Sequence, residues 1–135
     1  GASAVLHDVD ERVDAELRGD LTLADGVTGH FLSSFYLPEM TFTLQLRGSD
    51  GEAFAHNFCK AGLDNRITIT RGGESRVEHH GDRSSYTYQL EAFGRHVRQG
   101  APIHSDASDA VHQAMIMDAC YTAAGLPLRP ESHIA

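Results

Sequence analysis

The sequence of 135 residues is poor in cysteine and in basic residues, and each shortage excludes a class of protein. Its two cysteines, Cys59 and Cys120, lie in apolar contexts with no partner at a motif spacing, so we expect buried free thiols in a reducing cytoplasm. Lysine and arginine number 11 against 19 acidic residues, a net charge of −8 without any basic cluster. Nucleic acid and an anionic membrane surface are therefore not expected as partners.

Long apolar runs are also missing. No run reaches the roughly 18 residues that a membrane span requires, and residues 1–7 lack the basic region of a secretory signal. We therefore expect no membrane association and a cytoplasmic location. The length fits one ordinary domain, so residues 1–135 are predicted to form a single domain without an internal linker or repeat.

The motifs that carry most enzyme chemistry are absent as well. Among nine histidines, the adjacent His79 and His80 would point to opposite faces of a strand, and no His-x-x-x-His or Cys-x-x-Cys occurs, so no metal site is predicted. No Gly-x-Ser-x-Gly is present, and neither cysteine has an assigned base. The glycines at 48–51 and 72–73 lie between expected strands, not before a helix, so they are turn formers and bind no cofactor. We predict no catalytic residue in this chain.

What is present, from residue 13 onward, is the alternation of apolar and polar residues typical of antiparallel strands. Gly19 interrupts the apolar row of the first strand, which indicates a bulge or a close approach by a helix. Asp25-Gly26 predicts a tight hairpin, because both residues tolerate positive φ. The returning strand runs to Pro38, and further strands are expected at 40–47, at 52–58, around 67–69 and near 77.

Two helices are predicted after the strands. The first has an apolar stripe at spacings of four, three and four, namely Tyr86, Leu90, Phe93 and Val97. Ser84 or Ser85 can cap its start, and Gly100 ends it. The second helix begins near Asp106 and ends at Gly125, with an apolar arc so wide that we expect it to be covered over much of its circumference.

Strands followed by helices predict an α+β fold, an open antiparallel sheet of five or six strands with two C-terminal helices packed on one face. The second face of the sheet is less polar than a solvated face should be, since it carries Leu32, Tyr36 and several small residues. We therefore expect homo-oligomers that form through this face.

One loop offers candidate substrate contacts. Lys60 is the single lysine of the chain, and His56 and Asn57 precede it closely enough to face the same cleft. A solvated charge is the ordinary role of such a lysine, and a contact with a small-molecule substrate is the functional alternative.

Several short motifs resemble one family when taken in order. They are Val13-Asp14-Ala15, Asp25-Gly26-Val27-Thr-Gly29, Leu46-Arg-Gly48-Ser-Asp-Gly51-Glu52, Tyr86-x-x-Gln89-Leu90-x-x-Phe93, Arg98-Gln-Gly100-Ala-Pro102, Asp109-Ala110 and Met117-Asp118-Ala119-Cys-Tyr121. Together they cover nearly the whole chain and resemble the carboxy-terminal part of the Gfo/Idh/MocA oxidoreductases, the glucose-fructose oxidoreductase and inositol dehydrogenase family.

The resemblance implies a parent enzyme with two domains, a Rossmann domain for NAD or NADP and a carboxy-terminal sheet that lines the substrate site and mediates oligomers. The chain lacks the family's glycine fingerprint, its Glu-Lys-Pro and its Asp-x-x-x-His. It therefore corresponds to the substrate-binding and oligomerisation part of a dehydrogenase for a sugar, polyol or related hydroxyl compound, and it is not catalytic alone.

Two other interpretations remain open. The same sheet can serve a stand-alone, non-catalytic binding or oligomerisation module, and a closed, cone-shaped domain for a small ligand has similar strand content. The cone-shaped domain predicts a deep pocket within one chain, whereas the open sheet predicts an exposed face.

Overall fold

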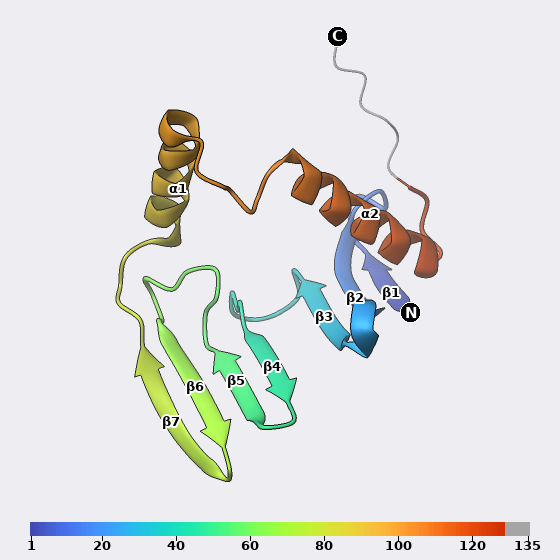
Figure 1. Cartoon of the computed structure of the whole chain (residues 1–135). Coiled ribbons are helices and arrows are strands. Elements are labelled where there is room, and N and C mark those ends of the chain that lie inside the picture. The colour runs from blue at the N-terminus through green and yellow to red at the C-terminus, as the bar shows by residue number, and fades with distance from the viewer. Residues whose placement is uncertain (129–135) are drawn as a thin grey trace. The chain divides into compact units, whose positions relative to one another are not determined.

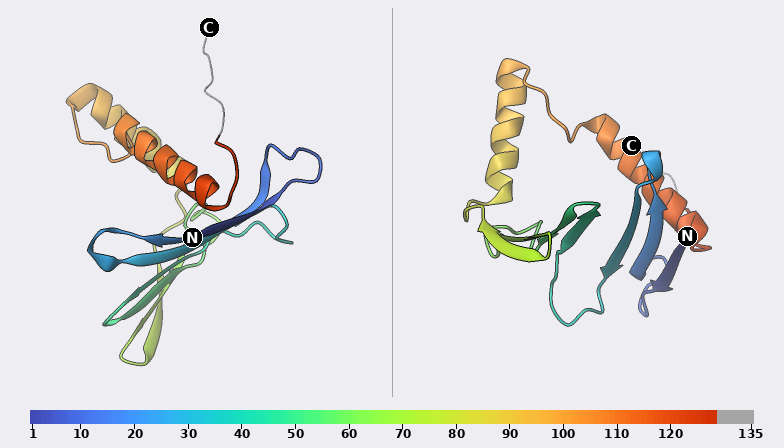
Figure 2. Two further views of the ribbon diagram at one scale, coloured as in Figure 1. Left: turned by 90° about the vertical axis from the view of Figure 1, so that its right-hand side faces the viewer. Right: turned by 60° about the horizontal axis from the view of Figure 1, so that its bottom comes forward.

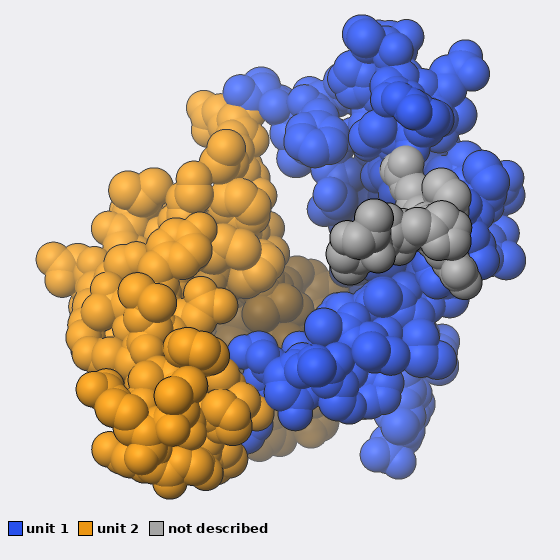
Figure 3. Space-filling model, turned by 90° about the horizontal axis from the view of Figure 1, so that it is seen from above, with its two compact units in different colours: residues 1–38, 104–135 blue, residues 39–103 orange. Residues whose placement is uncertain are grey.

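Seven β-strands and two α-helices make up the part of the chain that the computed structural model describes, residues 1–128 (Figure 1). They fall into two compact units, distinguished by colour in Figure 3. Unit 1 holds Gly1–Pro38 and the chain from His104 onward, and unit 2 holds Glu39–Ile103. None of the helices in the described residues has the length and apolar composition that a membrane span needs.

Unit 1 contains a three-stranded antiparallel sheet in the order β1-β2-β3. Its strands are β1 (Ala2–Leu6), β2 (Asp14–Thr22) and β3 (Thr28–Ser34). The predicted hairpin joins β2 to β3: Asp25 and Gly26 adopt φ values of 62° and 76°, and Leu23 N donates to Val27 O at 2.7 Å. The Asp25-Gly26 turn and the antiparallel return of the chain therefore agree with the prediction.

The two faces of this sheet differ in polarity. One face carries Ala15 and Leu17, each 1% exposed, and the nearby helix α2 (Ala107–Ala123) adds Cys120 at 5%. This helix lies against β1 (Figure 2). The opposite face holds an ion pair between Arg18 and Glu16 and a hydrogen bond between His30 and Asp20. One face of the three-stranded sheet thus carries a small apolar core, and the other face is polar and open to solvent.

Both ends of α2 lie where the sequence predicted them, but less of the helix surface is buried than predicted. Asp106 caps the start by accepting from Asp109 N at 3.0 Å, and Gly125 follows the end at a φ of 76°. Cys120 is the buried residue of the helix, whereas Val111 and Met115 are exposed. The wide apolar arc is therefore left largely uncovered by the described residues.

Unit 2 contains a four-stranded antiparallel sheet in the order β4-β5-β6-β7. Its strands are β4 (Leu44–Gly48), β5 (Gly51–Ala55), β6 (Arg66–Arg71) and β7 (Glu74–His79). Glycines make both tight turns, as predicted. A Cβ on Gly51 would lie 2.1 Å from Thr70 O, and Gly72 and Gly73 both have positive φ. These glycines shape strand turns, which leaves no phosphate-binding loop at either position.

The register of this sheet separates an apolar face from a polar face, because paired residues share a side. The apolar face carries Leu44, Leu46, Ala53, Ala55, Ile67 and Ile69 on β4, β5 and β6. On β7 the same face carries the ion pair of Arg76 and Glu78, so its apolar part is confined to the first three strands. The polar face carries Gln45, Arg47, Glu52, Phe54, Thr68, Thr70, Ser75 and Val77. No residue of unit 2 is fully buried, so the apolar face remains partly open to solvent.

Helix α1 (Ser85–Gln99) has the predicted caps and the predicted stripe. Ser84 Oγ accepts from Tyr86 N at 3.3 Å, and Gly100 ends the helix at a φ of 65°. One side-chain bond, from Ser85 Oγ to Cys59 O at 3.0 Å, ties its start to the loop after β5. The helix does not pack broadly on the strands of unit 2, and its apolar stripe stays exposed.

The predicted α+β class, the antiparallel strands and the C-terminal helices are confirmed. The structure differs in having seven strands divided between two sheets. The seventh strand is β1, within the first ten residues, where the lack of a sustained period allowed either a loop or a short strand. The expected strand up to Pro38 ends at Ser34, and the one expected from Met40 begins at Leu44.

Candidate functional site

His56 lies on the polar face of the four-stranded sheet, just beyond the end of β5. Its backbone N donates to Arg66 O at 3.2 Å, and its ring Nε2 lies 2.8 Å from Thr68 Oγ1. The ring also packs edge-on against Phe54, with the ring centres 4.9 Å apart. These contacts orient a half-buried imidazole whose second nitrogen can accept or donate to a bound hydroxyl group.

Asn57 has a structural contact that the sequence did not predict. Its Oδ1 accepts from the backbone N of Lys60 at 2.7 Å, and Lys60 O accepts from Leu63 N at 2.8 Å. An Asn side chain that bonds to a nearby amide stabilises a turn. Asn57 thereby shapes the loop that carries Lys60.

The ammonium group of Lys60 lies on an aromatic and thioether surface. Its Nζ is 3.2 Å from Met40 Sδ and 5.8 Å from the centre of the Phe42 ring. Phe58 packs edge-on against Phe42, with ring centres 6.4 Å apart. Among the described residues, no carboxylate forms an ion pair with Lys60. The group is thus an exposed cation that can donate to an oxygen-rich ligand.

A carboxylate in the same loop is neutralised locally. Asp64 accepts from Arg66 Nε at 2.8 Å and from Arg66 Nη2 at 2.7 Å. Those bonds from the guanidinium group lower the pKa of Asp64 well below its usual range, aided by the Arg66 amide and by His56. Asp64 therefore stays ionised and paired, and it does not act as a general acid near neutral pH.

The structure thus brings two of the three predicted contacts together. Asn57 bonds directly to the backbone of Lys60, whereas His56 bonds to Thr68 and Arg66. Their roles as substrate contacts remain a hypothesis. His56 and Lys60 present side chains to solvent, and the amide oxygen of Asn57 is already used.

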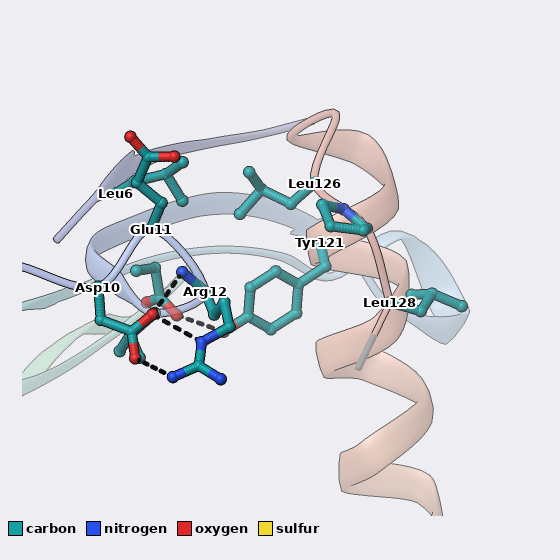
Figure 4. A pocket seen from close by; sticks show the side chains of 10 residues that line it. Leu6, Asp10, Glu11, Arg12, Tyr121, Leu126 and Leu128 are labelled. Carbon is teal, nitrogen blue, oxygen red and sulfur yellow. Dashed lines mark hydrogen bonds and ion pairs between the residues drawn. The ribbon is translucent and has the colours of Figure 1, made fainter. Parts of the chain in front are cut away.

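A separate hollow of about 530 Å³ lies in unit 1, and sequence reasoning missed it. It is lined by Leu6, residues 10–14, Tyr121 and residues 126–128 (Figure 4). Tyr121, near the end of α2, donates its hydroxyl to Asp14 Oδ1 at the start of β2. These residues are 107 positions apart, and no local motif links them.

An ion pair forms part of the wall of this hollow. Arg12 Nε and Nη2 each lie 2.9 Å from a carboxylate oxygen of Asp10, and this pairing raises the pKa of Arg12. A second hollow, of about 370 Å³, shares Asp10 and Val13 with the first. The walls are mainly apolar, so these hollows suit an apolar group better than a sugar.

Neither site has the chemistry of a complete catalytic centre. Within residues 1–128 no group of three or more potential metal ligands converges. The cysteine thiols are free, and they differ in burial: Cys120 is buried and Cys59 is half-buried. The glycine turns of unit 2 connect strands, so they do not fit the pyrophosphate of a dinucleotide.

Comparison with known proteins supports one fold class. No family model matches the sequence, and no curated protein matches it significantly. Among solved structures, the chain is similar to a crystal structure of a putative oxidoreductase from Bacteroides fragilis, with a TM-score of 0.60 and 18% identity. The similarity covers 96% of this chain and 44% of that one. The two proteins therefore share a fold, and this chain spans less than half the length of that oxidoreductase.

Proposed function

We propose that the chain is the carboxy-terminal, substrate-binding and oligomerisation part of an NAD(P)-dependent oxidoreductase of the Gfo/Idh/MocA type. Its substrate would be a sugar, a polyol or a related hydroxyl compound. The supporting observation is the similarity of 96% of this chain to less than half of a longer oxidoreductase. The ordered family-like motifs of the sequence support the same assignment.

The small core also supports a role as one part of a larger protein. In the described residues the buried apolar side chains are Ala15, Leu17 and Cys120, and many other apolar side chains lie on the surface. Large apolar side chains from several elements contribute to that surface, among them Leu46, Phe93 and Met115. Surface of this kind is characteristic of interfaces.

The polar loop of unit 2 is the proposed substrate side. Lys60 and His56 can donate to or accept from hydroxyl groups, and Thr68 fixes the orientation of His56. Asn57 maintains the loop that carries Lys60. A hydroxyl-rich substrate matches these groups better than an apolar one does.

NAD or NADP would be bound outside this chain. The described residues offer no glycine-rich turn that leads into a helix N-terminus, which is the arrangement that holds a pyrophosphate. We therefore derive no catalytic step from these residues, and we expect the chain to be inactive alone.

Oligomerisation would use the apolar residues of the four-stranded sheet. The face first expected to serve this purpose, with Leu32 and Tyr36, belongs to unit 1, where Leu32 stands opposite Arg18. On the four-stranded sheet Leu44 and Leu46 are exposed, beside the half-buried Ile67 and Ile69. The small side chains Ala53 and Ala55 between them allow another surface to approach closely.

The test compares the complete gene product with the 135-residue chain. If the reading frame encodes Gly-x-Gly-x-x-Gly and Glu-Lys-Pro upstream, the complete protein should bind NAD(P) and reduce it with some members of a polyol and sugar panel. The chain alone should do neither. Tight dinucleotide binding by the chain alone would overturn the proposal. A native start near Gly1 without an adjacent Rossmann-encoding gene would instead favour a stand-alone binding or oligomerisation module.

A further inference from the structure

The larger hollow of unit 1 has the size and the apolar walls of a small-molecule site. Its volume of about 530 Å³ falls within the range of about 300–1,000 Å³ that is usual for ligand pockets. Aliphatic side chains line it from two parts of the chain, Leu6 and Val13 near the start of β2 and Leu126 and Leu128 after the end of α2. The adjoining hollow adds the ring of Phe35. The apolar body of a small ligand therefore finds contacts on more than one side.

The charged side chains around this hollow are mostly acidic. Among the described residues that line it are three carboxylates and one guanidinium, a formal balance of −2, namely Asp10, Glu11 and Asp14 against Arg12. Arg12 binds Asp10 through two bonds of 2.9 Å, so its charge is already matched within the wall. The carboxylates of Glu11 and Asp14 remain as the charge that a ligand meets. Such a wall attracts a cation and repels an anion.

Asp14 and Tyr121 place a carboxylate and an aromatic ring next to each other. Tyr121 projects from α2 toward the loop that carries Arg12, and its hydroxyl donates to Asp14 Oδ1 (Figure 4). Asp14 is half-buried, and a carboxylate accepts several hydrogen bonds, so a bound N–H group can share it with the tyrosine. The face of a tyrosine ring also attracts cations. This combination suits an ammonium group that is attached to an apolar body.

We infer that the larger hollow binds a small organic cation, an ammonium group on an aromatic or aliphatic body. The ammonium group lies beside Asp14, Glu11 and the ring of Tyr121, and the body packs on the aliphatic wall. A neutral molecule of the same shape loses the charge contacts, and a carboxylate or phosphate is repelled. The site uses residues of unit 1 alone, so it does not depend on the proposed function of the loop around Lys60 in unit 2.

Three probes of similar shape test this inference on the 135-residue chain. They are 2-phenylethylammonium, the neutral 2-phenylethanol and the anionic 3-phenylpropanoate. Isothermal titration calorimetry at neutral pH should give the ammonium about tenfold higher affinity than the alcohol, and the carboxylate should bind most weakly. In NMR spectra the ammonium should shift the amide signals of Val13 and Tyr121 and leave that of Gly72, in a turn of unit 2, unchanged. Equal affinity for the ammonium and the alcohol, or shifts confined to other parts of the chain, would overturn the inference.

Two isosteric variants remove one charge each from the wall. Asp14→Asn keeps an oxygen that accepts from Tyr121, and it should lower the affinity for the ammonium about tenfold. Glu11→Gln changes an exposed side chain, so it should fold normally and lower that affinity about threefold. Neither variant should change the affinity for the alcohol.

Asp20→Asn is the matched control, because it makes the same change on β2 outside the hollow. It should leave the affinity for the ammonium unchanged. An unaltered affinity in both Asp14→Asn and Glu11→Gln would refute the site, and so would an equal loss in Asp20→Asn.

Discussion

Phe31 stands directly opposite Gly19 in the β2–β3 ladder, and its ring occupies the space that a side chain on Gly19 would fill. A Cβ built on Gly19 would lie 2.3 Å from Phe31 Cε1. The glycine is thus explained by an aromatic ring from the neighbouring strand, where the sequence indicated a bulge or a helix. An aromatic residue that covers a cross-strand glycine is a known device for stabilising sheets.

Gly19→Ala should therefore destabilise unit 1. The added methyl group forces the Phe31 ring to move, and overpacking of this kind costs ~1–2 kcal/mol. Gly29→Ala is the matched control in the same sheet, because no atom lies within 4 Å of its Cβ position. Urea unfolding of both variants measures the difference. The explanation fails if Phe31→Ala does not reduce the effect of Gly19→Ala in the double variant.

The bond between Tyr121 and Asp14 joins the end of α2 to β2 and is partly buried. Tyr121→Phe should lower the free energy of unfolding by ~1.5 kcal/mol, because a hydrogen bond to a carboxylate is lost. Tyr36→Phe is the control: its hydroxyl lies 3.2 Å from Asp8 Oδ1, and the residue is 53% exposed, so less than about 0.5 kcal/mol should be lost. Equal losses in the two variants would contradict the proposed anchoring role.

The features that the sequence predicted are those set by neighbouring residues. The Asp25-Gly26 hairpin, the glycine turns and the caps of both helices all depend on contacts within a few positions. Such local preferences hold in almost any tertiary setting. The class of fold followed from them, because strands and helices occur in separate parts of the sequence.

The features that the sequence did not predict depend on distant residues. The hollow of unit 1 exists because Tyr121 meets Asp14, and Gly19 is explained only by Phe31 on another strand. The sequence suggests Asn57 as a substrate contact beside Lys60, and the structure adds a bond to the Lys60 amide that gives it a structural role. The alternation of apolar and polar residues also predicted too late an end for β3. Apolar residues continue past Ser34, where the strand ends.

The pairing of Asp64 with Arg66 predicts a dependence of stability on pH. The folded protein lowers the pKa of Asp64, chiefly through the Arg66 hydrogen bonds, so the folded state binds the proton less readily than the unfolded state. The stabilisation is present above the unfolded pKa of about 3.9, and it decreases as the pH falls through the folded value. Asp64→Asn should therefore be less stable than the parent at pH 7, with the difference narrowing below about pH 4. A difference that stays constant from pH 7 to pH 2, by urea unfolding, would contradict this account.

Lys60 provides the sharpest test of the proposed substrate side. In the complete, active gene product, Lys60→Met should raise KM for the best hydroxyl substrate by about tenfold and change kcat less than about twofold, since a binding contact is removed without loss of a reacting group. Stability should be nearly unchanged, because Lys60 is exposed and forms no ion pair in the described residues. Arg71→Met is the control, since it removes an exposed cation at the far end of β6. An unchanged KM for Lys60→Met, or an equal rise for Arg71→Met, would exclude Lys60 as a specific substrate contact.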